Sequence, residues 1–195
     1  MCIRDSSLAL TVTGGYNASG DFVWWMNNIT FLGDLSDPMV LDAARGNTSF
    51  TQNKLRAAFD FGPSVKVIRI AMNAVGFPAA HPMHLHGHNF QVLANGIGTW
   101  DNSSIVRPNN PQRRDTHIMG PLGFAVFQWE LTNPGVWPFH CHIAWHTSQG
   151  MVLNIVEQKA KLAKETQLPG SVTETCNGWN AFTNKNVVNI VDSGV

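Results

Sequence analysis

Short apolar runs separated by Gly, Pro and Asn recur along the whole chain. The runs are rich in Val, Ile, Phe and Trp, and VKVIRI (65–70) alternates apolar and basic side chains as a half-buried strand does. They predict strands at 8–12, 22–26, 65–73, 89–94, 116–119, 124–132, 136–142 and 151–157. Many short strands with turn signals between them, and no alternation of strand and helix, favour an all-β sandwich or barrel.

Two segments favour helices. QNKLRAAF (52–59) is typical of a short helical connection, and SVTETCNGWNAF (171–182) is the stronger candidate. The second segment opens with Ser171 and carries Glu174 three positions later, which is the spacing of a capping box. Since the chain contains no internal repeat and no low-complexity linker, we expect one domain with a C-terminal tail.

Composition narrows the possible functions. The chain has 195 residues, 44% of them hydrophobic, which is enough for a sizeable core, and 13 basic residues balance 13 acidic ones. Neither a nucleic-acid footprint nor a basic membrane surface is indicated, and no apolar run approaches the roughly 18 residues of a spanning helix. The three cysteines cannot all pair with one another. Sequons for N-glycosylation give a hint of secretion, and they lie at Asn17, Asn28, Asn47 and Asn102.

The histidines fall into two clusters, HPMHLHGHNF (81–90) and PFHCHIAWHTSQGM (138–151). Successive side chains of a strand point to opposite faces. His84 and His86 therefore share one face and His81 takes the other, while His140 and His142 lie opposite to Cys141. If the two strands are neighbours, four histidines meet on one face and Cys141 meets His81 on the other.

The face with the cysteine offers a distinctive set of donors. His146 follows Cys141 by five residues, within reach of a short loop, and Met151 follows at ten. Two histidines, one thiolate and one weak thioether are the ligands of a blue-copper electron-transfer site. The four-histidine face also suits a metal that prefers imidazole, such as copper, and Cys141 joins the two groups through one stretch of backbone.

The two histidine clusters have other interpretations besides copper binding. An isolated His-x-His in a strand is usually a half-exposed pair, and a zinc hydrolase usually adds an acidic ligand or base, which neither cluster contains. Cys141 paired with a histidine could be a nucleophile. However, adjacent strand residues point apart, and even if both neighbouring histidines served the thiol, five other histidines of the clusters would be unexplained.

HPMHLHGH and HCHIAWHTSQGM resemble the two C-terminal copper motifs of the multicopper oxidases, and in detail those of laccases. FVWWMNNITF (22–31) also resembles the beginning of the last domain of that family, a cupredoxin Greek-key barrel. The resemblance implies that His81, Cys141 and His146 are type 1 copper ligands with Met151 axial. It assigns the type 2 copper to His84 and the type 3 pair to His86, His140 and His142. His88 matches a family histidine that is not a ligand, and His117 matches no motif.

The C-terminal tail carries a narrower resemblance, to ascomycete laccases. These end in Asp-Ser-Gly and an aliphatic residue that plugs a channel to the trinuclear cluster, and this chain ends in DSGV (192–195). A frayed polar terminus is the alternative. Cys176 resembles a tail cysteine that forms a disulfide with the first domain of such enzymes.

The chain departs from the family pattern in two respects. The family uses eight histidines for the trinuclear cluster, and only four of them are present, so we expect the last third of a three-domain enzyme. We divide it into a non-native or truncated start at 1–7, a copper-binding cupredoxin domain at 8–160 and a C-terminal helix and tail at 161–195. Met151 is the second departure, because laccases more often have Leu or Phe there, whereas bilirubin and ascorbate oxidases have Met.

The sequence thus predicts the C-terminal domain of a secreted, laccase-like multicopper oxidase. Its reductant would be a phenol or similar small molecule that delivers electrons at His146. These would pass through Cys141 to a cluster that reduces dioxygen to water, completed by N-terminal domains of the same enzyme. Alone, the chain should be inactive. The alternatives are a stand-alone blue-copper electron-transfer protein, an assembly that completes the cluster across chains, and a bilirubin- or ascorbate-oxidase-like enzyme.

Overall fold

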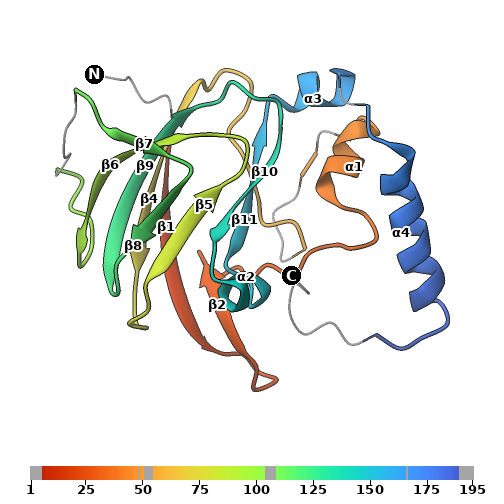
Figure 1. Cartoon of the computed structure of the whole chain (residues 1–195), viewed down its shortest axis with the longest axis horizontal. Coiled ribbons are helices and arrows are strands. Elements are labelled where there is room, and N and C mark those ends of the chain that lie inside the picture. The colour runs from red at the N-terminus through yellow and green to blue at the C-terminus, as the bar shows by residue number, and fades with distance from the viewer. Residues whose placement is uncertain (1–5, 48, 51–54, 104–108, 166, 189–195) are drawn as a thin grey trace.

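Two β-sheets packed face to face form the body of the protein (Figure 1). The computed structural model describes residues 6–47, 49–50, 55–103, 109–165 and 167–188. The first sheet has the strand order β2-β1-β4-β9-β6-β7 and the second has the order β3-β11-β10-β5-β8. The strands of the first sheet are β1 Ser6–Tyr16, β2 Phe22–Met26, β4 Val67–Ala74, β6 Phe90–Ile97, β7 Gln112–Arg114 and β9 Gly123–Glu130. Those of the second are β3 Ala58–Asp60, β5 His81–Leu85, β8 Thr116–Met119, β10 Gly135–Cys141 and β11 Val152–Glu157.

All eight predicted strands are confirmed, most to within two residues at either end. β1 begins at Ser6 and so takes in the last two residues of the segment that we assigned to the irregular start. Two pairs of strands are parallel, β1 with β4 and β3 with β11, and the other pairs are antiparallel. The predicted alternation is present in β4, where Ile68 and Ile70 have no exposed surface.

The core lies between the two sheets. Its largest fully buried side chains come from both inner faces and include Trp24, Phe90, Phe127 and Phe139. β11 differs from the other strands because all six of its residues are buried. Its outer face is covered as well, since Val156 packs in a small cluster with Met39 and Ala58.

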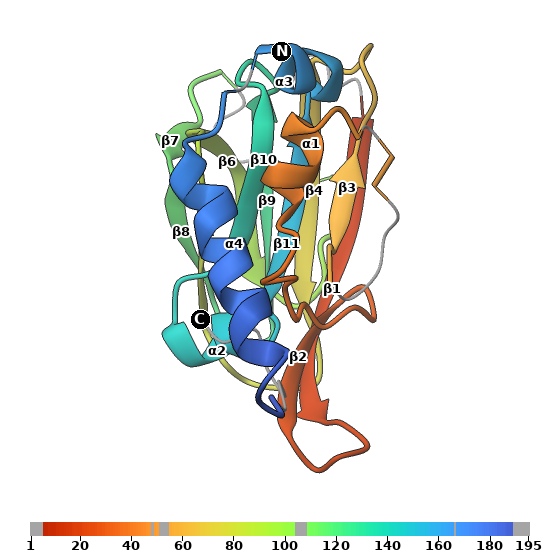
Figure 2. The same ribbon diagram turned by 90° about the vertical axis from the view of Figure 1, so that its right-hand side faces the viewer.

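Four helices lie outside the sheets: α1 Met39–Ala44, α2 Ala144–Ser148, α3 Lys159–Glu165 and α4 Gly170–Thr183. α1, α3 and α4 gather on the side of β10 and β11, away from the first sheet (Figures 1 and 2). α2 follows directly on β10. Among the described residues, no helix is long and apolar enough to cross a membrane.

The predicted helix at 52–59 is wrong. Residues 55 and 56 form a turn and Ala58–Asp60 form β3, while 52–54 lie outside the described residues. Pairing with β11 overrides the local preference, because Asn154 on that strand donates a side-chain hydrogen bond to the carbonyl of Arg56 (2.7 Å) and a backbone one to that of Ala57 (2.9 Å). A positive φ of 42° at Ala57 also ends any helical path.

The predicted helix at 171–182 is confirmed as α4, but its capping box is not. The helix begins at Gly170, after Pro169 in an extended conformation, and no side chain caps it. Ser171 therefore lies inside the first turn, where its carbonyl accepts a hydrogen bond from the hydroxyl of Thr175 (2.8 Å).

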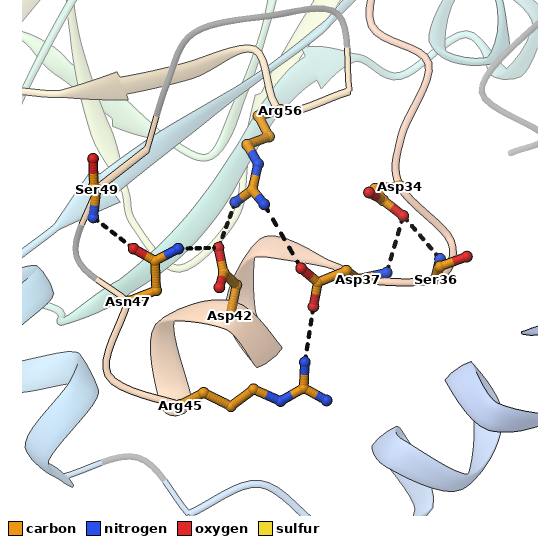
Figure 3. A network of polar contacts seen from close by, with 8 residues as sticks. All are labelled: Asp34, Ser36, Asp37, Asp42, Arg45, Asn47, Ser49 and Arg56. Atoms are coloured by element: carbon orange, nitrogen blue, oxygen red, sulfur yellow. Dashed lines mark hydrogen bonds and ion pairs between the residues drawn. The ribbon is translucent and has the colours of Figure 1, made fainter.

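No pattern in the sequence predicted α1, which a polar network holds to the edge of the second sheet (Figure 3). Arg56 contacts the carboxylates of Asp42 (2.6 Å) and Asp37 (3.7 Å), and the side-chain amide of Asn47 donates to Asp42 (2.8 Å). Burial raises the pKa of Asp42, but these hydrogen bonds outweigh it, and the pKa is lowered overall. The network ties the segment between β2 and β3 to the strand that follows it.

Candidate metal centres

The register of β5 and β10 brings the two histidine clusters together. His84 lies opposite His140, and Met83 lies opposite Cys141. The pairing extends past the strand ends, because the backbone N–H of His142 donates to the carbonyl of Pro82 (2.7 Å). As predicted from strand parity, His84 and His140 are on the partly exposed face, and Cys141 turns into the interior.

His81, Cys141 and His146 form the first cluster, and their donor atoms lie within 4.8 Å of one another. The Nδ1 atom of His146 is 3.3 Å from Nδ1 of His81 and 3.4 Å from Sγ of Cys141. His81 and Cys141 have no exposed surface. His146 comes from α2, and Thr147 beside it holds that turn back on β10 by donating its hydroxyl to the carbonyl of Cys141.

Met151 follows this cluster as the sequence predicted and is fully buried. Its backbone N–H donates to the carbonyl of His146 (2.9 Å), and its own carbonyl accepts from the N–H of Cys141 (3.2 Å). Gly150 makes the approach possible. Its φ is +100°, and a Cβ atom there would lie 2.0 Å from Oγ1 of Thr30.

An aromatic side chain that the sequence analysis did not single out backs the first cluster. The ring of Trp24 lies 4.8 Å from that of His81 and 4.6 Å from that of His146, measured between centroids. It also contacts Phe22 and Phe77 edge to face. The position of Trp24 beside two histidines from other elements is a product of the tertiary fold, and no local sequence signal indicated it.

The surroundings of the first cluster favour neutral nitrogen donors. Burial, helped by the neighbouring His146, lowers the pKa of His81 from 6.5 to about 4. Burial also lowers the pKa of His146 and raises that of the Cys141 thiol to about 11. Without a cation the thiol is therefore protonated at neutral pH, and a bound metal ion would have to displace that proton.

His84, His86 and His140 form the second cluster, with ring nitrogens within 4.8 Å of one another. The Nε2 atoms of His86 and His140 are 2.9 Å apart. Burial is the main cause of the lowered pKa of both. His142 lies at the edge, with its ring centroid 5.5 Å from that of His84 and 5.8 Å from that of His140.

Hydrogen-bond contacts of the Nδ1 atoms orient two rings of the second cluster. Nδ1 of His84 contacts the carbonyl of Asp115 (2.9 Å) and the hydroxyl of Thr116 (3.0 Å), and Nδ1 of His140 contacts the carbonyl of Cys141 (2.9 Å). Their Nε2 atoms are left for a ligand, which is the usual arrangement of metal-binding histidines. A depression of about 700 Å³ opens beside His84 and His86.

Both clusters fit a bound copper ion by their donor chemistry. One thiolate with two imidazoles suits a blue-copper site, and several imidazoles suit copper as well. In the first cluster, Nδ1 of His81 lies 3.3 Å from Nδ1 of His146, which in turn lies 3.4 Å from Sγ of Cys141, so the three donors converge on one point.

The remaining histidines are not part of either cluster. His88 lies against Glu157, and neither ring nitrogen of His117 has a hydrogen-bond partner within the described structure. Cys176 is buried on α4 as a free thiol. Cys2 and the terminal DSGV lie outside the described residues, so the channel plug and the disulfide stay predictions.

A two-sheet sandwich with a Cys-His-His cluster at the end of one sheet defines a cupredoxin-like domain. Comparison with known proteins extends this, since residues 27–161 match the family model described as multicopper oxidase. The chain belongs to the multicopper oxidase family.

Individual relatives agree. The chain is 34% identical over 168 residues to the oxidoreductase OpS5 of Beauveria bassiana, an alignment that covers 86% of this chain and 28% of that protein. It is 32% identical over 205 residues to Laccase-2 of Botryotinia fuckeliana, covering 96% and 35%. A mutant of the laccase from B. aclada matches in structure with a TM-score of 0.81 at 28% identity, covering 97% of this chain and 35% of that one.

The comparisons confirm the predicted cupredoxin-like all-β fold and the predicted resemblance to laccases. The chain spans about a third of the length of the relatives that it matches.

Proposed function

We propose that this chain holds copper in two groups and, as part of a longer laccase-like enzyme, carries electrons from a small reductant toward dioxygen. Copper, when bound, would supply the one-electron redox chemistry and the reduction of dioxygen to water. His81, Cys141 and His146 would hold the type 1 copper, with the thioether of Met151 as a further ligand. His84 would serve the type 2 copper, and the type 3 pair would use His86, His140 and His142.

The observation that carries the proposal is the position of Cys141 between His140 and His142. The thiol belongs to the first cluster, and the imidazole of His140 belongs to the second. Three consecutive residues therefore join both groups by covalent bonds, which gives electrons a short connected route between them.

We propose that the reductant is a phenol or similar aromatic compound that approaches His146. This histidine is partly exposed at the surface, and Trp145 beside it is 71% exposed. Phe77, which contacts Trp24 behind the cluster, is 41% exposed. Exposed aromatic rings favour flat apolar ligands by stacking and burial. The alternative of a bilirubin- or ascorbate-oxidase-like enzyme rests on Met151. Comparing a phenol with bilirubin and ascorbate as reductants separates these candidates.

The second cluster would be completed by residues from N-terminal cupredoxin domains of the same enzyme. Only four of the eight family histidines occur in this chain, and the depression beside His84 and His86 leaves room for more. In this proposal residues 8–160 are the copper-binding unit, and the segment 161–195 is the helical tail.

The proposed enzyme is secreted and glycosylated. The sequons support this, and Asn28 is exposed in a tight turn with a φ of 64°, where a glycan would meet no core side chain. A mobility shift on endoglycosidase treatment of the secreted protein is the expected result. Secretion without any shift would remove glycosylation from the proposal.

A stand-alone electron-transfer protein is the second candidate, because the first cluster supplies a complete blue-copper donor set in one chain. Oxygen consumption separates the two candidates. The copper-loaded chain should accept electrons from a phenol and bleach its blue band without sustained oxygen uptake. Joined to the N-terminal domains it should consume oxygen continuously. If the joined protein consumes none, the oxidase proposal fails and the electron-transfer candidate remains.

The Cys141→Ser variant tests the assignment of the first cluster. A serine hydroxyl is a hard, weak ligand for copper, so the intense blue thiolate absorption should disappear. An intact blue band in this variant would show that the thiolate is not the ligand.

A further inference from the structure

Glu157 is a buried carboxylate that belongs to neither cluster. It is the last residue of β11 and has no exposed surface. Its Oε2 lies 2.8 Å from Nε2 of His88, within ion-pair distance but outside hydrogen-bond geometry, and the His88 side chain is only 6% exposed. Its Oε1 accepts a hydrogen bond from the backbone N–H of Asn133, in the loop between β9 and β10. Burying a carboxylate is costly unless partners surround it, so this arrangement is a fixed one.

The partners of Glu157 hold the loop that begins with His86. The side-chain amide of Asn133 donates to the carbonyl of Gly87 (3.0 Å), and His88 packs against the carboxylate at an ion-pair distance. The ring of Trp137 packs under Gly87, where a Cβ atom would lie 2.6 Å from it, and its Nε1 donates to the carbonyl of Asn133 (2.8 Å). Both residues that follow His86 are thus clamped from β10, β11 and the loop before β10.

We propose that Glu157 and Asn133 are positioning residues that fix His86 for metal binding. They hold the loop so that the imidazole of His86 faces that of His140 at 2.9 Å before an ion arrives. His86 lies beyond the end of β5 and its side chain is exposed, whereas His84 and His140 lie within paired strands. The backbone N–H of His86 still donates to the carbonyl of Pro138 on β10 (3.0 Å), so the clamp adds its support through the two residues that follow. This inference rests on the proposed copper function of the second cluster.

Zinc binding to the second cluster tests the clamp. The Cys141→Ser background silences the first cluster, and Zn²⁺ affinity is then measured calorimetrically at neutral pH. Loss of Zn²⁺ binding on His84→Ala in this background identifies the second cluster as the binding site. The clamp variants are Glu157→Gln, which keeps the shape and an acceptor for Asn133, and Asn133→Ala, which changes a half-buried loop residue. Asn154→Ala is the matched control, because it removes a buried side-chain hydrogen bond from the same strand on the side of β3.

The clamp variants should lose about 10- to 100-fold in Zn²⁺ affinity, as is usual for outer-shell partners, and the Asn154→Ala control should not. In the metal-free protein, the NMR signals of the His86 ring should broaden or multiply in the clamp variants alone. Unchanged affinity in folded Asn133→Ala and Glu157→Gln proteins would overturn the inference. If Glu157→Gln does not fold, the Zn²⁺ affinity of Asn133→Ala alone decides whether the clamp positions His86.

The outcomes also separate this inference from the proposed function. If the background protein shows no Zn²⁺ binding that depends on His84, the second cluster is not a metal site, and both proposals fail. If that binding is present and equal in the clamp variants, only the positioning role of Glu157 and Asn133 fails.

Discussion

His84 lies opposite His140 in the antiparallel pair of β5 and β10. A shift of this register by one residue would turn His84 toward the interior and separate it from His140, because side chains alternate between the faces of a strand. The same pairing sets Cys141 beside the buried face of β5, from which His81 projects. One register therefore assembles both clusters.

Gly150 should be intolerant of substitution. Gly150→Ala adds a Cβ atom 2.0 Å from Thr30 to a residue with a φ of +100°, whereas Gly20→Ala, at a φ of +85°, meets nothing within 4 Å. The control should lose about 1 kcal/mol of unfolding free energy for backbone strain alone. Gly150→Ala should lose at least about 2 kcal/mol more, because Thr30 or the loop must move. Chemical denaturation measures both, and equal losses would contradict the close packing of this loop.

Met151→Leu should raise the potential of the copper that we propose for the first cluster. The swap nearly conserves volume, so packing should change little, but in the proposed site it removes a thioether that would stabilise oxidised copper. Each ~59 mV of rise is a tenfold shift in a one-electron equilibrium, which a voltammetric titration resolves. An unchanged potential with an intact blue band would make Met151 a core residue only.

Metal uptake by the first cluster should release one proton. The pKa of Cys141 is about 11, so its thiol is protonated at pH 7, whereas His81, with a pKa of about 4, is already neutral. Between about pH 7 and pH 9 the affinity for Co²⁺ should therefore rise about tenfold per pH unit. The thiolate-to-cobalt absorption band reports binding. An affinity independent of pH would mean that the thiol is not the group displaced.

His117 should make the metal-free protein less stable in acid. Burial, with a smaller contribution from Arg114, lowers its pKa below the usual 6.5. The unfolded chain therefore takes up the proton more readily, so stability is complete above pH 6.5 and falls below it, by up to about 1.4 kcal/mol per pH unit for one proton.

His117→Phe should remove the part of the acid-induced loss of stability that His117 causes. A phenyl ring is chosen because it can keep the contact with Phe127. Unfolding free energies of both proteins at pH 7.5 and pH 5 measure the effect. Equal losses in the two would show that the proton binds elsewhere.

The sequence predicted eight of the eleven described strands and the division of histidines between two faces, because both depend on local alternation. It could not predict β3 or α1, which exist through contacts distant in sequence: Asn154 with Arg56, and Arg56 with Asp42. The surroundings of the clusters were missed for the same reason. Trp24 and Glu157 reach them from other strands, and no spacing in the sequence connects either residue with a histidine motif.

Anomalous scattering from crystals of the copper-loaded chain tests the central claim most directly, since it locates each metal ion among the side chains. We expect a fully occupied copper site bounded by His81, Cys141 and His146. A second, weaker site is expected at His84, His86 and His140, because we propose that other domains complete that cluster. Copper bound elsewhere, with nothing beside Cys141, would contradict the account.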